Sequence, residues 1–134
     1  MRPLALIVVA MLSACASGPP EVPANVLAIR DYVEVAELPE VDKIRTYQET
    51  GYEELDNERF IFYKARRTTY LVEFTRDCWE LRDNQRITPD VRRDPSYLRP
   101  GMDTIRGCRI GRAYELDEAQ ADEIRNIGDA PTGG

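Results

Sequence analysis

The stretch from Phe60 to Cys78 constrains the fold more than any other part of the chain. Its first residues, Phe60 to Tyr63, are all apolar, which predicts a central strand covered on both faces. Along Thr69 to Thr75 the residues alternate, as in a half-buried strand: one face is apolar (Tyr70, Val72, Phe74) and the other is more polar (Thr69, Leu71, Glu73, Thr75). The sequence therefore predicts a β-hairpin around which the rest of the chain is arranged.

The link between these strands, Lys64 to Thr68, contains no glycine. Because tight two-residue hairpin turns favour glycine, this composition predicts a longer loop. Arg66 and Arg67 lie at its tip, where charged side chains normally stay solvated and protect the hairpin end from aggregation.

The first residues of the chain have the pattern of a secretory signal. A positive start at Arg2 precedes an apolar run from Leu4 to Leu12, which is too short for a permanent membrane helix. The run ends in Leu12-Ser13-Ala14-Cys15, which resembles a bacterial lipobox. That resemblance implies a signal peptide over residues 1–14 and lipidation of Cys15. The alternative is an ordinary secreted protein that is cut nearby.

Ala16 follows the predicted lipidated cysteine, and the absence of aspartate there is typical of Gram-negative lipoproteins that reach the outer membrane. Residues 15–24 contain three prolines and read as a semi-extended tether. We expect one β-rich domain over residues 25–128 and a disordered tail over 129–134.

The remaining cysteines form an even pair. In an oxidising envelope compartment, Cys78 and Cys108 are expected to form a disulfide that stabilises this small domain by roughly 3 to 4 kcal/mol. The alternative is a redox-active or nucleophilic thiol. The sequence has no CxxC spacing and no histidine to serve as a base, which disfavours that alternative.

Segments before the hairpin carry weaker signals. Val26, Ile29 and Val33 could share one side of a short helix, but we favour a strand over Asp31 to Glu37 that ends at Pro39. Ile44 to Tyr52 reads as a further strand interrupted by a bulge or bend at Gly51.

Segments after the hairpin complete the predicted domain. We expect a helical turn at Asp77 to Leu81 with Trp79 in the core, and a long polar loop over Arg82 to Pro100. Two closing strands follow, Asp103 to Ile105 and Cys108 to Leu116, which turn at Gly107. A helix comes next, which Asp117 caps together with Gln120, with Ala121, Ile124 and Ile127 as its buried stripe. The predicted fold is mainly β or α+β, with an open antiparallel sheet or partly closed barrel, one C-terminal helix and one disulfide.

Taken together, three features resemble a family of small proteobacterial lipoproteins of unknown function. They are the lipobox, the Tyr70-Leu71-Val72 strand that leads to Cys78, and Cys108-Arg109-Ile110 leading to Tyr114-Glu115-Leu116-Asp117. The resemblance covers about Asp42 to Ile127 and implies anchoring and a disulfide. Since that family has no established activity, it implies no catalysis.

Charge is unevenly distributed along the chain. Residues 21–58 contain eleven acidic and three basic residues, whereas residues 82–112 contain eight arginines and four acids. Arg86, Arg92, Arg93 and Arg99 fall in the basic loop (residues 82–107), and guanidinium groups suit phosphates and carboxylates. The loop could therefore bind lipopolysaccharide, peptidoglycan or an envelope protein. The alternative is that it neutralises the acidic half of the domain.

Candidate catalytic residues are few. With no histidine, the common general base and zinc ligand are missing, and no cofactor or metal motif appears. Glu53, Glu54 and Asp56 could form a carboxylate pair for glycoside hydrolysis. We expect instead a non-catalytic outer-membrane lipoprotein that faces the periplasm and binds an envelope partner. Its net charge of −6 and its compartment disfavour nucleic acid.

Overall fold

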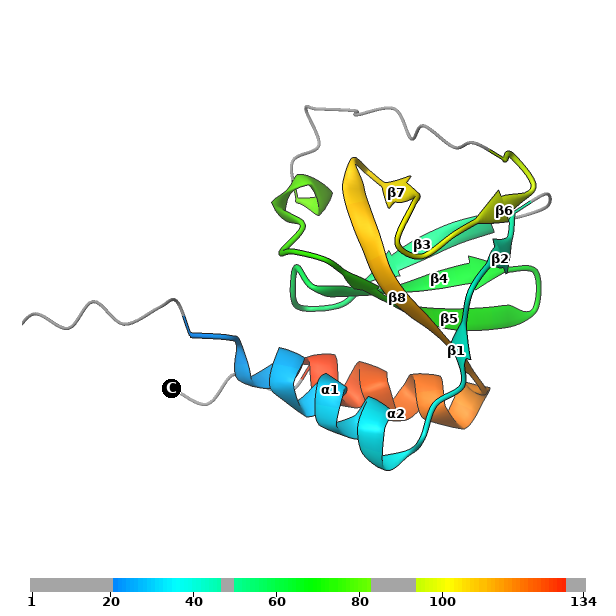
Figure 1. The fold of residues 1–134 in the computed structure, drawn as a ribbon. Helices are drawn as coiled ribbons and strands as arrows, with labels where there is room; N and C mark the ends of the chain where they lie inside the picture. The colour runs from blue at the N-terminus through cyan, green and yellow to red at the C-terminus, as the bar shows by residue number, and fades with distance from the viewer. Residues whose placement is uncertain (1–20, 47–49, 83–93, 130–134) are drawn as a thin grey trace, which may run out of the picture.

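The computed structural model describes residues 21–46, 50–82 and 94–129. Two helices lie side by side across one side of a curved antiparallel sheet (Figure 1). They are α1 (Ala24–Val35) and α2 (Glu118–Asp129). The strands and the short 3-10 helix η1 are β1 (Glu40–Val41), β2 (Ile44–Arg45), β3 (Thr50–Glu54), β4 (Phe60–Ala65), β5 (Thr68–Phe74), η1 (Trp79–Leu81), β6 (Tyr97–Leu98), β7 (Thr104–Ile105) and β8 (Cys108–Leu116). None of the helices in these ranges has the length and apolar character needed to cross a membrane.

The main sheet has the strand order β1-β8-β5-β4-β3, and β7 adds to β8 outside this path. The sheet is not closed, so the open-sheet alternative is the right one and the barrel is not formed. A second small sheet pairs β2 with β6. Strand β8 is the longest strand and pairs with β1, β5 and β7, which makes it the structural centre of the domain.

Both faces of the main sheet are buried. One face packs against β2, η1, β6 and β7, through a cluster that includes Ile61, Val72 and Ile110. The other packs against the helices, through a cluster that includes Phe62 and Ile124. Every residue of the predicted central strand is therefore covered, as its uniformly apolar sequence indicated.

The central hairpin is confirmed, with two differences. Leu71 lies on the face that was expected to be polar, yet it is 0% exposed because the helices cover that face. Ala65 pairs directly with Thr68, so the expected longer loop is wrong and Arg66 with Arg67 forms a two-residue turn. Arg66 supplies the left-handed backbone (φ 58°) that glycine usually provides in such turns.

The strand expected over Asp31 to Glu37 is wrong, because this segment belongs to helix α1 and the turn that follows it. The helical stripe of Val26, Ile29 and Val33 was the better indicator, since these residues pack on the second cluster. The domain therefore contains two helices where one was predicted.

The strand expected over Ile44 to Tyr52 is divided between β2 and β3, which belong to different sheets. Gly51 lies within β3 and pairs in regular register with Lys64, so the predicted bulge at this glycine is wrong. Within the loop expected over Arg82 to Pro100, the short strand β6 was not predicted.

The C-terminal elements follow the prediction closely. The turn between β7 and β8 lies at Arg106 and Gly107, both of positive φ, as in a type I′ hairpin turn. The capping box is formed: the Gln120 amide donates to the Asp117 carboxylate (2.7 Å), and the Asp117 amide donates to the Gln120 side chain (2.9 Å). The expected helical turn at Asp77 to Leu81 is confirmed as η1, but Trp79 is 50% exposed and is not a core residue.

Candidate functional site

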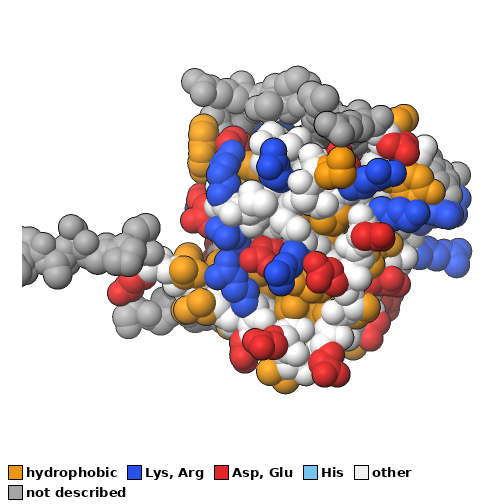
Figure 2. Space-filling model, viewed as in Figure 1, with side chains coloured by type: hydrophobic (Ala, Val, Ile, Leu, Met, Phe, Trp, Pro, Cys, Tyr) orange, Lys and Arg blue, Asp and Glu red, His pale blue; other side chains and the backbone are white. Residues whose placement is uncertain are grey.

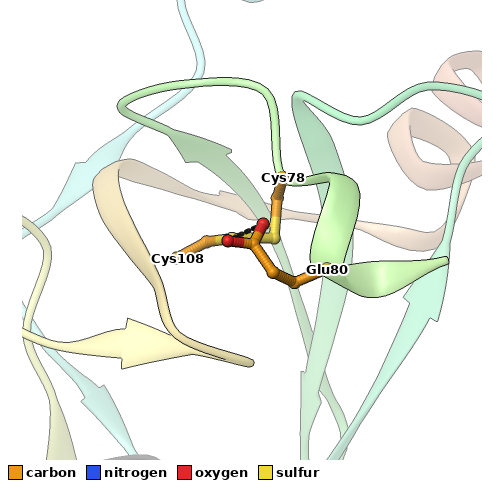
Figure 3. A group of neighbouring side chains, drawn as sticks. All are labelled: Cys78, Glu80 and Cys108. Atoms are coloured by element: carbon orange, nitrogen blue, oxygen red, sulfur yellow. Dashed lines mark hydrogen bonds between the residues drawn. A yellow bond between two sulfur atoms is a disulfide. The ribbon is translucent and has the colours of Figure 1, made fainter. Parts of the chain in front are cut away.

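The predicted disulfide between Cys78 and Cys108 is formed, with the two Cα atoms 5.8 Å apart. It connects the residue before η1 to the first residue of β8, and both cysteines are fully buried. Glu80 of η1 points back toward the bridge, and its Oε2 lies 3.1 Å from Cys108 Sγ (Figure 3). Both carboxylate oxygens of Glu80 also accept hydrogen bonds from Arg76.

This arrangement fixes the charge beside the disulfide. The hydrogen bond from Arg76 is the main cause that lowers the pKa of Glu80, so the carboxylate stays ionised next to the sulfur atoms. Cys78, Glu80 and Cys108 bring three potential metal-ligand atoms within 4.8 Å of one another. While the disulfide is intact, however, neither sulfur offers a thiolate to a metal ion.

Several predicted site residues fall outside the described residues: Cys15, Arg86, Arg92 and Arg93. Arg99 is described and exposed, and its backbone amide donates to the Asp103 carboxylate (2.6 Å). Arg82, at the start of the basic loop, forms an ion pair with Glu58 at 3.6 Å. That pair joins the basic loop to the acidic half of the chain. Such a contact is expected if the loop neutralises the acidic half of the domain.

The acidic residues weighed as a catalytic pair do not converge. Glu53 and Glu54 are consecutive residues of β3, so their side chains point to opposite faces of the strand. Glu53 forms ion pairs with Arg125 of α2 (3.1 Å) and Lys64 of β4 (3.3 Å). Its hydrogen bond with Arg125 is the first cause of its lowered pKa, which is unsuited to a general acid.

Sequence reasoning missed a groove of about 740 Å³ between α1 and the sheet. Figure 2 views the molecule from this side, and the lower half of the face shows hydrophobic atoms bordered by basic and acidic side chains. The apolar part of the lining comes from Val33, Leu38, Phe74 and Tyr114. The charged part comes from Arg30, Glu34, Glu37, Glu40, Arg59, Glu73 and Arg112.

The strand order places charges of alternating sign across the groove. Glu40 in β1 pairs with the β8 residue Tyr114, and Arg112 in β8 pairs with Glu73 in β5. Arg59 follows beside β5, because its carbonyl accepts a hydrogen bond from the Phe74 amide. The row therefore runs basic, acidic, basic, acidic from Arg59 to Glu40.

Helix α1 adds Arg30 above this row. The Arg30 side chain donates to the Glu73 carboxylate at 3.2 Å, and Arg59 Nε lies 3.9 Å from the same oxygen, Oε1. Arg59 also reaches Asp77 at 3.5 Å. Arg112 lies on the other side of Glu73, in β8. Its pKa is raised mainly by a hydrogen bond with Tyr114 and further by the charges of Glu40 and Glu73.

A β-bulge at Gly111 shapes the groove. The register between β5 and β8 shifts between Glu73 and Phe74, which pair with Arg112 and Ile110 and leave Gly111 as the extra residue. A Cβ atom at Gly111 would lie 3.3 Å from the Glu73 carbonyl oxygen, a tight contact. The bulge thus lets the strands stay close where Glu73 and Arg112 meet.

One sequence signal pointed to this site. Glu73 is a charged residue between Val72 and Phe74 in a strand with buried positions on both faces, so it required a partner. That partner, Arg30, could not be identified while α1 was taken for a strand. The arrangement offers guanidinium donors and carboxylate acceptors around an apolar floor, which is chemistry for binding.

Together, the fold and the groove define a small disulfide-linked α+β domain with a charged groove. A family model described as "Family of unknown function (DUF6491)" matches residues 1–126, and the chain belongs to this family. No curated protein and no solved structure matches the chain.

Proposed function

We propose that this protein is a lipid-anchored, non-catalytic interaction domain of the Gram-negative envelope, attached to the outer membrane through Cys15 and facing the periplasm. The observation that carries the proposal is the buried Cys78–Cys108 disulfide, because structural disulfides persist in oxidising compartments such as the periplasm. The lipobox accounts for the third cysteine.

Within this proposal, the basic loop is the contact with an anionic envelope partner. Arg99 supports this role because it is exposed, and it lies in the same loop as Arg86, Arg92 and Arg93. Guanidinium groups form paired hydrogen bonds with phosphates and carboxylates, which lipopolysaccharide and peptidoglycan both display.

Metabolic labelling with an alkyne fatty acid in a Gram-negative host tests the anchor. We expect label on the wild-type protein and none on Cys15→Ser. The matched control, Cys78→Ala with Cys108→Ala, keeps Cys15 and should keep the label. Wild-type protein without label, found in the soluble periplasmic fraction, would rule out the anchor.

Photo-crosslinking in living cells from a probe at position 99 tests the loop. We expect a discrete adduct that is lost in the double variant Arg92→Gln/Arg93→Gln. The control, Arg66→Gln/Arg67→Gln, removes the same charge from the hairpin tip and should keep the adduct. Links only to the protein's own acidic half would mean that the loop arginines serve the fold. An adduct unchanged in both variants would mean that these arginines are not the interface.

A further inference from the structure

We propose that the groove between α1 and the sheet binds a small zwitterionic molecule of the amino-acid or short-peptide class. Its carboxylate lies at the Arg30 and Arg59 end, and its protonated amine lies at the Glu37 and Glu40 end. This inference goes beyond the proposed function, because it involves neither Cys15 nor the basic loop.

The size and floor of the groove suit such a ligand. A volume of about 740 Å³ is within the range of small-molecule sites, which is roughly 300 to 1,000 Å³. Val33, Leu38 and Phe74 contribute apolar surface on which the uncharged body of a ligand can rest. Charged groups at the two ends would then set its direction.

The basic end has guanidinium hydrogen-bond donors that are not all paired with protein acceptors. Arg30 and Arg59 both approach the single carboxylate of Glu73, and that carboxylate also faces Arg112 in the sheet. Arg59 Nε is buried and has no hydrogen-bond acceptor among the described residues. Arg59 has a second ion pair, with Asp77 at 3.5 Å, but its Nε stays without an acceptor. A ligand carboxylate at this end would therefore gain charge-assisted hydrogen bonds from guanidinium groups that share the Glu73 carboxylate.

The acidic end has the opposite imbalance. Glu34 and Glu37 are exposed at the C-terminal end of α1 and just after it, and Glu40 is exposed on β1. Across the described ranges, no ion pair involves any of these three carboxylates. An ammonium group would be attracted to this end and repelled from the arginine end.

The balance of charge excludes a simple anion as the preferred ligand. Four glutamates and three arginines line the groove, so a free phosphate would meet more carboxylates than guanidinium groups. A molecule that carries both charges satisfies both ends at once. The charges alternate across the strands, but the row ends in Arg59 on one side and Glu40 on the other, so its two ends favour the opposite charges of a zwitterion.

The test is calorimetric titration of the detergent-solubilised full chain, disulfide intact, with the tripeptide Ala-Leu-Ala. Four forms of the peptide are used: free, N-acetylated, C-amidated and capped at both ends. We expect saturable binding of the free form, about tenfold weaker binding for each single cap, and none for the doubly capped form. A tenfold loss is the modest effect of one partly solvated charge contact.

Variants assign each charge to its end of the groove. Arg59→Gln should weaken the free peptide about tenfold and leave the amidated peptide unaffected, because that form has no carboxylate to lose. Glu37→Gln/Glu40→Gln should weaken the free peptide and leave the acetylated peptide unaffected. Arg67→Gln, outside the groove, is the charge-matched control for Arg59→Gln, and Glu54→Gln is a control for the loss of a carboxylate outside the groove.

Each other outcome overturns the proposal. Equal binding of capped and free peptides would mean that the charges do not recognise the ligand. No saturable binding of the free peptide at about 10 mM, or tighter binding of inorganic phosphate than of the peptide, would exclude a zwitterion site. Because Glu37 and Glu40 are exposed, their variants keep the test valid if Arg59→Gln fails to fold. A failure here leaves lipidation and loop crosslinking untouched, so the two proposals can fail separately.

Discussion

At the scale of single residues, Glu53 connects three elements of the fold. It lies on β3 and pairs with Arg125 of α2 and Lys64 of β4. The pairing with Arg125 lowers the pKa of Glu53 below the usual 4.5. The stability from this carboxylate is therefore fully present above pH 4.5 and is lost as the pH falls through the lower, folded-state pKa.

We expect Glu53→Gln to lower the free energy of unfolding at pH 7 by no more than about 1 kcal/mol, because Glu53 is more than one-third exposed. The difference from wild type should shrink as the pH is lowered stepwise below 4.5, through the lowered pKa of the folded state. Urea unfolding at these pH values measures it, with Glu54→Gln as the control on the other face. A difference that does not change with pH would contradict the pairing.

Glu80 gives a second prediction at this scale. Its ionised carboxylate lies 3.1 Å from Cys108 Sγ and should repel an incoming thiolate. We expect Glu80→Gln to speed reduction of the disulfide by dithiothreitol roughly fivefold, the effect of about 1 kcal/mol between solvated charges. Thiol release measures the rate. Asp77→Asn, which is a nearby exposed carboxylate, should react at the wild-type rate.

Single residues also show where sequence reasoning reached its limit. The capping box of Asp117 and the turn glycine Gly107 were predictable because their chemistry is local. Trp79 was not, because its exposure depends on how η1 lies against the rest of the molecule. Arg66 adopts a backbone conformation that its type disfavours, so composition alone pointed to the wrong turn.

At the scale of elements, the main error was to predict a strand within α1. Its main consequence was that the groove was missed. The acidic, weakly amphipathic sequence of α1 resembles a strand almost as well as a helix, and packing against α2 and the sheet decides between them. The groove depends on α1, so the candidate site was lost together with the helix. The β4–β5 hairpin was predictable because β4 begins with a continuous apolar run and β5 alternates, and both are rich in β-branched and aromatic residues.

We expect the apolar face of α1 to carry its stability. Ile29 is 0% exposed in the cluster beneath the helices, and Ile29→Ala should lower the free energy of unfolding by about 2 to 5 kcal/mol. Leu27→Ala, on the same helix at 52% exposure, should change it by no more than about 0.5 kcal/mol. Chemical denaturation measures both values. Equal effects would mean that α1 does not pack as described.

At the scale of the whole molecule, the Cys78–Cys108 disulfide connects segments that are 30 residues apart in sequence. We expect Cys78→Ala/Cys108→Ala to lower the free energy of unfolding by roughly 3 to 4 kcal/mol on the chain-entropy model. Denaturant unfolding, compared with wild type in the presence and absence of reductant, measures the loss. If reductant leaves wild type as stable as before, the disulfide contributes little.

The disulfide and the mainly β composition were predictable at this scale, since the cysteine number, with an oxidising compartment expected from the lipobox resemblance, limits the pairing. Strand order was not, because two of the strands that pair with β8, β1 and β5, come from distant parts of the chain. The small β2–β6 sheet was likewise invisible, since each strand has only two residues.

The position of β1 at the edge of the sheet has a mechanical consequence. Only two residue pairs join β1 to β8, whereas β5 and β8 share a long ladder. A pulling force applied at the N-terminal end of the domain would reach α1 first. It would then separate these two pairs in sequence, one after the other. Strands β3, β4, β5 and β8 would stay together, braced by the disulfide. The groove would be the first part to open, so tension on the chain would weaken whatever the groove holds.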